Sequence, residues 1–190
     1  LAARYLPAMP QSYVETVTPA QSIDDIRQME RLQAEGGLTL NLYEKDGALR
    51  FKLFSLDREI ALSDALPMLE NLGMKVLTEN PYTLHIDGRR VVIQDFALEA
   101  TVPGLRAEHI KADFEQAFGA VWRGQSENDG FNKLVSLAGL GWRRVSVLRA
   151  YGKYLLQIGV PFSQSYMEET LQRYPALARI LIGLFDARFN

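Results

Sequence analysis

The sequence lacks cysteine and has only two histidines, His85 and His109. The absence of cysteine excludes disulfide bonds and thiolate metal sites, and it is compatible with a reducing compartment. No apolar run reaches the roughly 18 residues of a membrane-spanning helix, and the first residues lack the pattern of a signal peptide. The formal net charge is only −2 with mixed signs, so no nucleic-acid partner is expected. We therefore expect a cytoplasmic globular protein.

Motifs for cofactor binding and catalysis are also missing. The GLG run at residues 139–141 would need a further glycine at position 144 to form a dinucleotide fingerprint, but Arg144 is there. Gly119 and Gly124 have the spacing of a phosphate-binding loop, but Gly124 is followed by Gln125 and Ser126, not by the lysine that such a loop requires. The two histidines lack the spacing of a zinc site or a catalytic triad. We predict no catalytic, cofactor-binding or metal-binding residue in this chain.

Residues 117–159 form the most informative stretch, because they hold both tryptophans. Apolar residues recur there at helical spacing, which predicts two amphipathic helices over about 127–138 and 142–158. Ser126 is placed to cap the first helix, with Asp129 as the second member of a capping box. The glycines between the two helices lie where the pair must turn.

A dense group of charged side chains lies near the two tryptophans. The simpler interpretation is an ion-paired helix junction with aromatic anchors. The sharper interpretation is an interdomain or oligomer contact, because arginine forms bidentate pairs and tryptophan buries a large area in interface cores. Trp142 has two matching interpretations, as a wedge buried between helices or as an exposed docking residue. The group comprises Trp122, Arg123, Glu127, Asp129, Trp142, Arg143, Arg144 and Arg149.

Residues 38–53 have the period-two pattern of a β-hairpin. Apolar side chains alternate with polar ones on both sides of Asp46-Gly47, so one face of each strand points inward. Gly47 accepts the positive φ of a primed turn, which makes this dipeptide a strong hairpin signal. Further strands are expected at 13–17, 74–78, 82–86 and 91–98.

Two helices separate these strands, one from Pro19 to Gly36 and one from Ser63, as its N-cap, to Gly73. The resulting order is strand, helix, two strands, helix, then two or three strands. Such an order is typical of a ferredoxin-like or ACT-like antiparallel sheet with helices on one face. The predicted fold class is therefore α+β.

After Pro103-Gly104 the apolar pattern is helical throughout, so an all-α helical module is expected to follow the sheet. We place the ACT-like α+β module at residues 1–102 and the helical module at 103–190. The predicted helices of the second module are about 105–119, 127–138, 142–158, 164–173 and 175–188.

Several long stretches resemble the large NAD-specific glutamate dehydrogenases of bacteria. The runs VWRGQSENDGFNKLV, GLGWRRVSVLRAYGKYL and GVPFSQSYMEETL carry the resemblance in the second half. In the first half, LRFKLFSLDREIALSDALPMLENLGMKVLTENPY and IQDFALE are similar to the preceding segment of that family. Together these runs cover most of residues 49–190. The chain begins with leucine and ends in a helical pattern, so we expect a piece of a longer protein.

The resemblance implies that the full-length protein oxidatively deaminates L-glutamate to 2-oxoglutarate and ammonia while reducing NAD. Because this chain lacks the nucleotide and substrate motifs, it would be a non-catalytic regulatory or architectural segment ahead of the catalytic domain, inactive alone. Its expected partners are the remaining domains of the same chain and other subunits. Two alternatives stay open: an ACT-like module that binds an amino-acid effector, and a purely structural subunit contact. No glycine-marked loop near residues 12–19 supports an amino-acid pocket.

Overall fold

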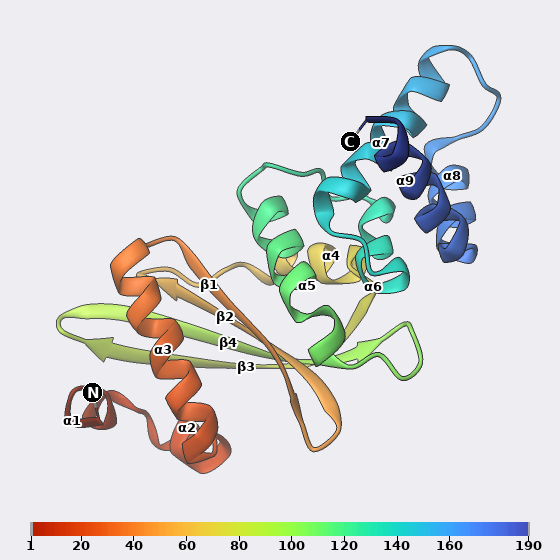
Figure 1. The fold of residues 1–190 in the computed structure, drawn as a ribbon. Helices are drawn as coiled ribbons and strands as arrows, with labels where there is room; N and C mark the ends of the chain where they lie inside the picture. Colours follow the sequence, from red (N-terminus) through yellow and green to blue (C-terminus); the bar gives the residue numbers. More distant parts are fainter. Residues whose placement is uncertain (1, 190) are drawn as a thin grey trace. The chain divides into compact units, whose positions relative to one another are not determined.

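The structure is a computed structural model that describes residues 2–189, with side chains from residue 4 to residue 189. The chain divides into two compact units, whose elements are labelled in Figure 1. The first unit comprises the chain up to Ala65 together with Val76–Glu99. The second comprises Leu66–Lys75 together with the chain from Ala100 onward. A separation of folding modules between residues 102 and 103 stays a prediction.

The first unit is built on a four-stranded antiparallel sheet in the order β1-β2-β4-β3. Leu42 on β1 pairs with Phe51 on β2, which in turn pairs with Phe96 on β4. Because paired residues share a face of the sheet, these three buried side chains form one apolar row across it. The strands are β1 (Leu38–Lys45), β2 (Ala48–Leu56), β3 (Met74–Ile86) and β4 (Arg89–Ala100).

Two tight hairpins connect neighbouring strands. Asp46 and Gly47 join β1 to β2 with φ of 52° and 77°, and Asp87 and Gly88 join β3 to β4 with φ of 50° and 77°. Positive φ at both central residues is the signature of a type I′ turn, whose twist matches that of the strands. The turn predicted at Asp46-Gly47 is confirmed, and Asp87-Gly88 has the same geometry.

The strands predicted at 74–78 and 82–86 are joined in a single strand, β3. Pro81 lies inside this strand, although a proline was expected to interrupt it. β3 lies at the edge of the sheet, where a proline is tolerated because one side of the strand has no partner and needs no N–H donor.

The strand predicted at 13–17 is wrong, because these residues belong to helix α2 (Gln11–Thr16). Pro10 precedes the helix, and the Val17 amide closes it by donating to the Tyr13 carbonyl. Tyr13 is fully buried, and its hydroxyl donates to Asp25 Oδ2 over 2.6 Å. Tertiary packing of this side chain outweighs the β propensity of its neighbours. The strand predicted at 91–98 is present as β4.

Helix α3 (Pro19–Glu35) covers one face of the sheet, and the prediction for this helix is confirmed. Thr18 caps it in a capping box with Gln21. Its buried Met29 and Leu32 pack with Phe54 and with Tyr5 from helix α1 (Ala2–Tyr5) in one apolar cluster. The short helix η1 (Leu6–Ala8) connects α1 to α2, so all the N-terminal helices contribute to the same layer.

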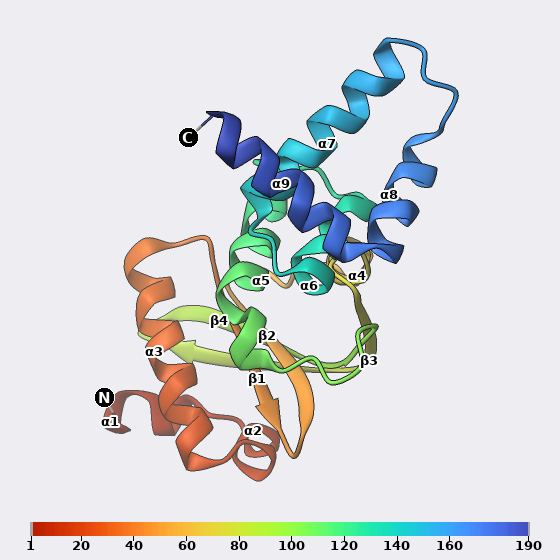
Figure 2. The same ribbon diagram turned by 45° about the vertical axis from the view of Figure 1, so that its right-hand side comes forward.

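The second unit is mainly helical, as predicted, and Figure 2 shows its last helices from another side. Helix α4 begins at Leu62, so Ser63 lies in its first turn and is not the N-cap that was predicted. The end of α4 is held by Ser136 Oγ, which donates to the Leu72 carbonyl over 2.7 Å. Helix α4 (Leu62–Asn71) belongs to the second unit from Leu66 onward. The other helices of this unit are α5 (Ala107–Trp122), η2 (Gly130–Lys133), α6 (Leu134–Ala138), α7 (Trp142–Gln157), α8 (Gln164–Arg173) and α9 (Pro175–Phe189). The single helix predicted over 127–138 is instead a loop followed by the short helices η2 and α6.

The raised pKa values of three tyrosines in the first unit predict that the unit loses stability at alkaline pH. Burial raises the pKa of Tyr5 to about 12, with a contribution from its hydrogen bond to Glu30. Burial also raises the pKa of Tyr13 and Tyr43, and the carboxylates of Asp25 and Asp95 add to the effect. An unfolded tyrosine loses its proton near pH 10. The stabilisation from these phenols is therefore complete below about pH 10 and is lost as the pH rises further.

We expect the urea midpoint of the chain to fall steeply above about pH 10, and less steeply in Tyr13→Phe, which removes one of the phenols. Phenolate absorbance should show a late-titrating group among the eight tyrosines. A uniform titration of all tyrosines near pH 10, with a pH-independent midpoint, would contradict this account.

Candidate functional site

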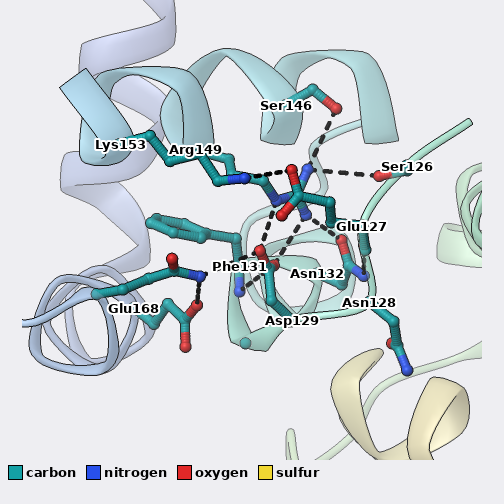
Figure 3. Close-up of polar contacts among 12 residues, drawn as sticks. Ser126, Glu127, Asn128, Asp129, Phe131, Asn132, Ser146, Arg149, Lys153 and Glu168 are labelled. Carbon is teal, nitrogen blue, oxygen red and sulfur yellow. Dashed lines mark hydrogen bonds and ion pairs between the residues drawn. The ribbon is translucent and has the colours of Figure 1, made fainter. Parts of the chain in front are cut away.

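The predicted charged group has Arg149 at its centre. Arg149 lies on α7, and only 4% of its surface is exposed. Its guanidinium forms a bidentate pair with Asp129, with distances of 2.7 Å from Nε to Oδ2 and 2.9 Å from Nη2 to Oδ1 (Figure 3). Nη2 also donates to Asn132 Oδ1 over 2.7 Å. We call this set of contacts the arginine junction.

Two serines complete the arginine junction. Arg149 Nη1 donates to Ser146 Oγ over 3.3 Å and to Ser126 Oγ over 3.4 Å. A guanidinium has five N–H donors, and the contacts with Asp129, Asn132, Ser126 and Ser146 number five. Every donor of this buried cation is therefore directed at a protein acceptor.

The loop before η2 is ordered by the same residues. Asp129 is the N-cap of η2, because its Oδ1 accepts from the Phe131 amide over 3.1 Å. The predicted capping role of Ser126 is wrong, since its side chain contacts the guanidinium of Arg149 instead. Asp129 thus has two functions at once, as a helix cap and as the counterion of a buried arginine. Asn132 adds a third tie by donating to the Glu127 carbonyl over 2.8 Å.

Helix α8 is attached to this loop by neutral amides. Gln164 donates to Glu168 Oε1 over 2.7 Å and to Asp129 Oδ2 over 3.4 Å. Gln172 donates to the Gly130 carbonyl over 2.8 Å. The side chains of Glu127 and Lys153 form an ion pair at the exposed rim of the junction. Loop, α7 and α8 are therefore joined through one polar network (Figure 3).

The structure brings together three of the eight predicted residues, namely Glu127, Asp129 and Arg149. Arg144 pairs instead with Asp186 on α9 over 3.0 Å. The remaining contacts are made elsewhere in the unit. The Arg143 guanidinium lies 4.5 Å from the centre of the half-buried Trp142 ring, Arg123 donates to Gln125 over 3.3 Å, and the half-buried Trp122 ends α5.

An apolar groove of about 550 Å³ lies beside the arginine junction, between α7, α8 and α9. Phe131 belongs to both, because it lines the groove and its ring centre lies 5.9 Å from Arg149 Cζ. Gly152 on α7 allows this close approach, since a Cβ there would lie 3.0 Å from Phe131 Cζ. Arg188 is the one charged side chain among the described residues of the lining. Such a mainly apolar lining suits the binding of an apolar partner.

Sequence reasoning missed a second buried polar cluster, which lies between α3 and the sheet of the first unit. Lys52 and Asp25 are each 1% exposed and form an ion pair of 2.5 Å. Burial raises the pKa of Asp25, and the nearby Lys52 cation opposes that shift. On the same face Asp95 accepts from Arg50 over 3.0 Å and from Tyr43 over 2.9 Å.

The only trace of this cluster in the sequence is the alternation of apolar and polar residues along β2, which places Lys52 on the polar side of the strand. That side is not open to solvent at Lys52, because α3 packs over it and Asp25 of α3 pairs with Lys52. Each carboxylate is neutralised by a cation, and the whole cluster lies under a helix, so its geometry is that of a structural contact.

No group of three or more metal-ligating side chains is present between residues 2 and 189. His109 lies near Glu108 at 3.8 Å, with both side chains largely exposed. No helix within the described part of the chain is long and apolar enough to cross a membrane.

Three family models for glutamate dehydrogenase match the chain. Residues 1–32 match helical motif 2, residues 37–111 match the ACT3 domain, and residues 126–190 match helical motif 3. The ACT3 match contains all four strands, which confirms the ACT-like prediction for the sheet. The arginine junction lies within the match to helical motif 3.

Curated relatives cover nearly the whole chain. The NAD-specific glutamate dehydrogenase of Halomonas elongata is 37% identical over 195 residues, which is 100% of this chain and 12% of the relative. Those of Mycobacterium tuberculosis and Pseudomonas aeruginosa are 39% and 38% identical, over 99% and 95% of this chain. The chain spans about 12% of the length of each relative.

Removal of the buried cation should destabilise the helical unit. Arg149→Met leaves Asp129 buried without its counterion, and we expect a loss of about 3–5 kcal/mol in the free energy of unfolding. Arg143→Met is the matched control, since it removes an exposed arginine of the same helix and should cost at most about 1 kcal/mol. Denaturant unfolding of both variants measures the difference. Equal midpoints would show that the arginine junction does not stabilise the fold.

Proposed function

Because the chain belongs to the glutamate dehydrogenase family of these NAD-specific relatives, we propose that it is a non-catalytic, architectural segment of such an enzyme. The resemblance seen in the sequence is confirmed by three family models and by relatives of 37–39% identity. The complete enzyme would convert L-glutamate, NAD and water into 2-oxoglutarate, ammonia and NADH. NAD and glutamate would bind in parts of the polypeptide outside residues 1–190.

The main support for this proposal is that every N–H donor of Arg149 already has a protein acceptor. An arginine that binds a substrate carboxylate needs free N–H donors directed at the substrate. In the arginine junction all five donors are directed at Asp129, Asn132, Ser126 and Ser146. Asp129 is likewise engaged as cap and counterion, which leaves it unsuited to general base catalysis. The chemistry of this site is thus directed inward, at holding helices together.

The ACT3 match favours one second candidate, the binding of an amino-acid effector by the first unit. A ligand that binds only the folded state raises the unfolding temperature by mass action. A thermal-shift series with the common amino acids therefore separates an effector-binding segment from a purely architectural one. A shift that saturates with one amino acid would favour the effector role.

The architectural role predicts a clear kinetic result. We expect no glutamate-dependent formation of NADH by residues 1–190 alone, because the chain has no nucleotide-binding motif. In the longer polypeptide, Glu127→Gln should leave kcat unchanged, although Glu127 is the most exposed carboxylate of the predicted site, with 56% of its side chain accessible. A catalytic carboxylate would instead lose about 10²–10⁴-fold in rate. A loss of that size, or turnover by the purified chain, would overturn the proposal.

A further inference from the structure

Exposed apolar side chains are concentrated at the end of the chain. Among the described residues, eighteen large hydrophobic side chains are exposed, of which five precede residue 100 and thirteen lie between 151 and 189. Apolar surface gathered in one region, rather than scattered singly, marks an interaction site. The helices that carry it, α7, α8 and α9, also form the walls of the apolar groove.

Helix α9 has an apolar stripe of its own. Leu177, Ile180, Leu181 and Leu184 follow the spacing i, i+3, i+4, i+7 and are 41%, 60%, 40% and 63% exposed. This spacing places them along one side of the helix. The buried Ala178 and Ile182 show that α9 already uses other positions for packing inside the unit.

The stripe and the groove form one continuous surface. Leu181 and Leu184 belong to the stripe and also line the groove, where Tyr151 and Leu155 of α7 lie on the other wall. Helix α9 has 15 residues and is therefore roughly 22 Å long. A helix-sized apolar surface of this kind fits an amphipathic helix, which lays its apolar face into a groove.

The charge of this region indicates the chemistry of the occupant. Residues 143–190 contain seven Lys or Arg and three Asp or Glu. Arg149 and Lys153 are paired with acids that precede this segment, and Arg144 is paired with Asp186. The other four cations, the arginines at 143, 173, 179 and 188, still outnumber the other two carboxylates, at 168 and 169. Arg188 places one of these cations in the groove lining. A second copy of the chain would bring the same positive surface against itself, which like charges oppose. An occupant with acidic flanks is complementary.

We propose that the groove and the α9 stripe bind an amphipathic helix with acidic flanks, supplied by the part of the same polypeptide outside residues 1–190. This inference rests on the proposed function, that the chain is a segment of a longer enzyme. The relatives support such a source, because the chain spans about 12% of their length. Tethering in one polypeptide raises the effective concentration of the helix to the order of millimolar, so a modest affinity is sufficient.

The test places a photo-crosslinking amino acid at position 184 of the longer polypeptide. Protein made from a mixture of ¹⁵N-labelled and unlabelled chains distinguishes the sources of the captured peptide by mass. We expect cross-links to an apolar, acidic segment outside residues 1–190, with both partners carrying the same isotope. The matched control carries the crosslinker at Leu77, an exposed leucine of the first unit, 54% accessible, and should not capture that segment.

Mixed-isotope cross-links would identify a second copy as the occupant and overturn the inference. Capture no greater than at Leu77 would also overturn it. Glutamate-dependent NADH formation by the same preparation separates the two proposals, because an active enzyme without the cross-link leaves the proposed function standing while the groove inference fails.

Leu184→Glu adds an independent readout in the longer polypeptide. The new carboxylate opposes both the apolar contact and the acidic flank, so hydrogen exchange in α7 and α9 should become faster than in the parent. Leu77→Glu should leave exchange in these helices unchanged. Equal exchange in parent and Leu184→Glu would contradict a bound helix at this surface.

Discussion

The burial of one guanidinium is the constraint on which the helical unit depends. A cation taken out of water is costly unless its charge is balanced and its donors are satisfied. Arg149 meets both conditions only if Asp129, Asn132 and the two serines lie where they do. These acceptors come from the loop before η2, from η2 and from α7 itself, so the loop conformation and the placement of α7 are determined together.

The apolar groove follows from this arrangement. Phe131 comes directly after the capped loop, and its amide is held by Asp129 while its ring closes against Gly152. Helix α8 is held to the same loop by Gln172 and forms another wall. The polar network thus fixes the loop and the helices on one side of Phe131, and the apolar groove lies on its other side. That division suits a segment whose task is to hold parts of an enzyme in place.

Local pattern predicted most of the elements but not how they pair. Most helices after residue 105 and the hairpin at Asp46-Gly47 follow from periodicity and turn chemistry, which act over a few residues. Arg149 and Asp129 were grouped by nearness in sequence, but their bidentate contact depends on a turn that brings positions 20 residues apart together. Tyr13 was misread as a strand residue, since its buried contact with Asp25 is not visible in local propensity. Alternation places Lys52 on the polar side of its strand, but it does not reveal that a helix covers that side.

A double-mutant cycle on Asp129 and Arg149 tests the central claim, that these two groups act on each other to hold the helical unit. Unfolding free energies of Asp129→Ala, Arg149→Ala and the double variant give the coupling between them. The account predicts a coupling of about 1–3 kcal/mol, because each single change leaves a buried partner uncompensated. Additive effects within about 0.5 kcal/mol would show that the two side chains act independently and would contradict it.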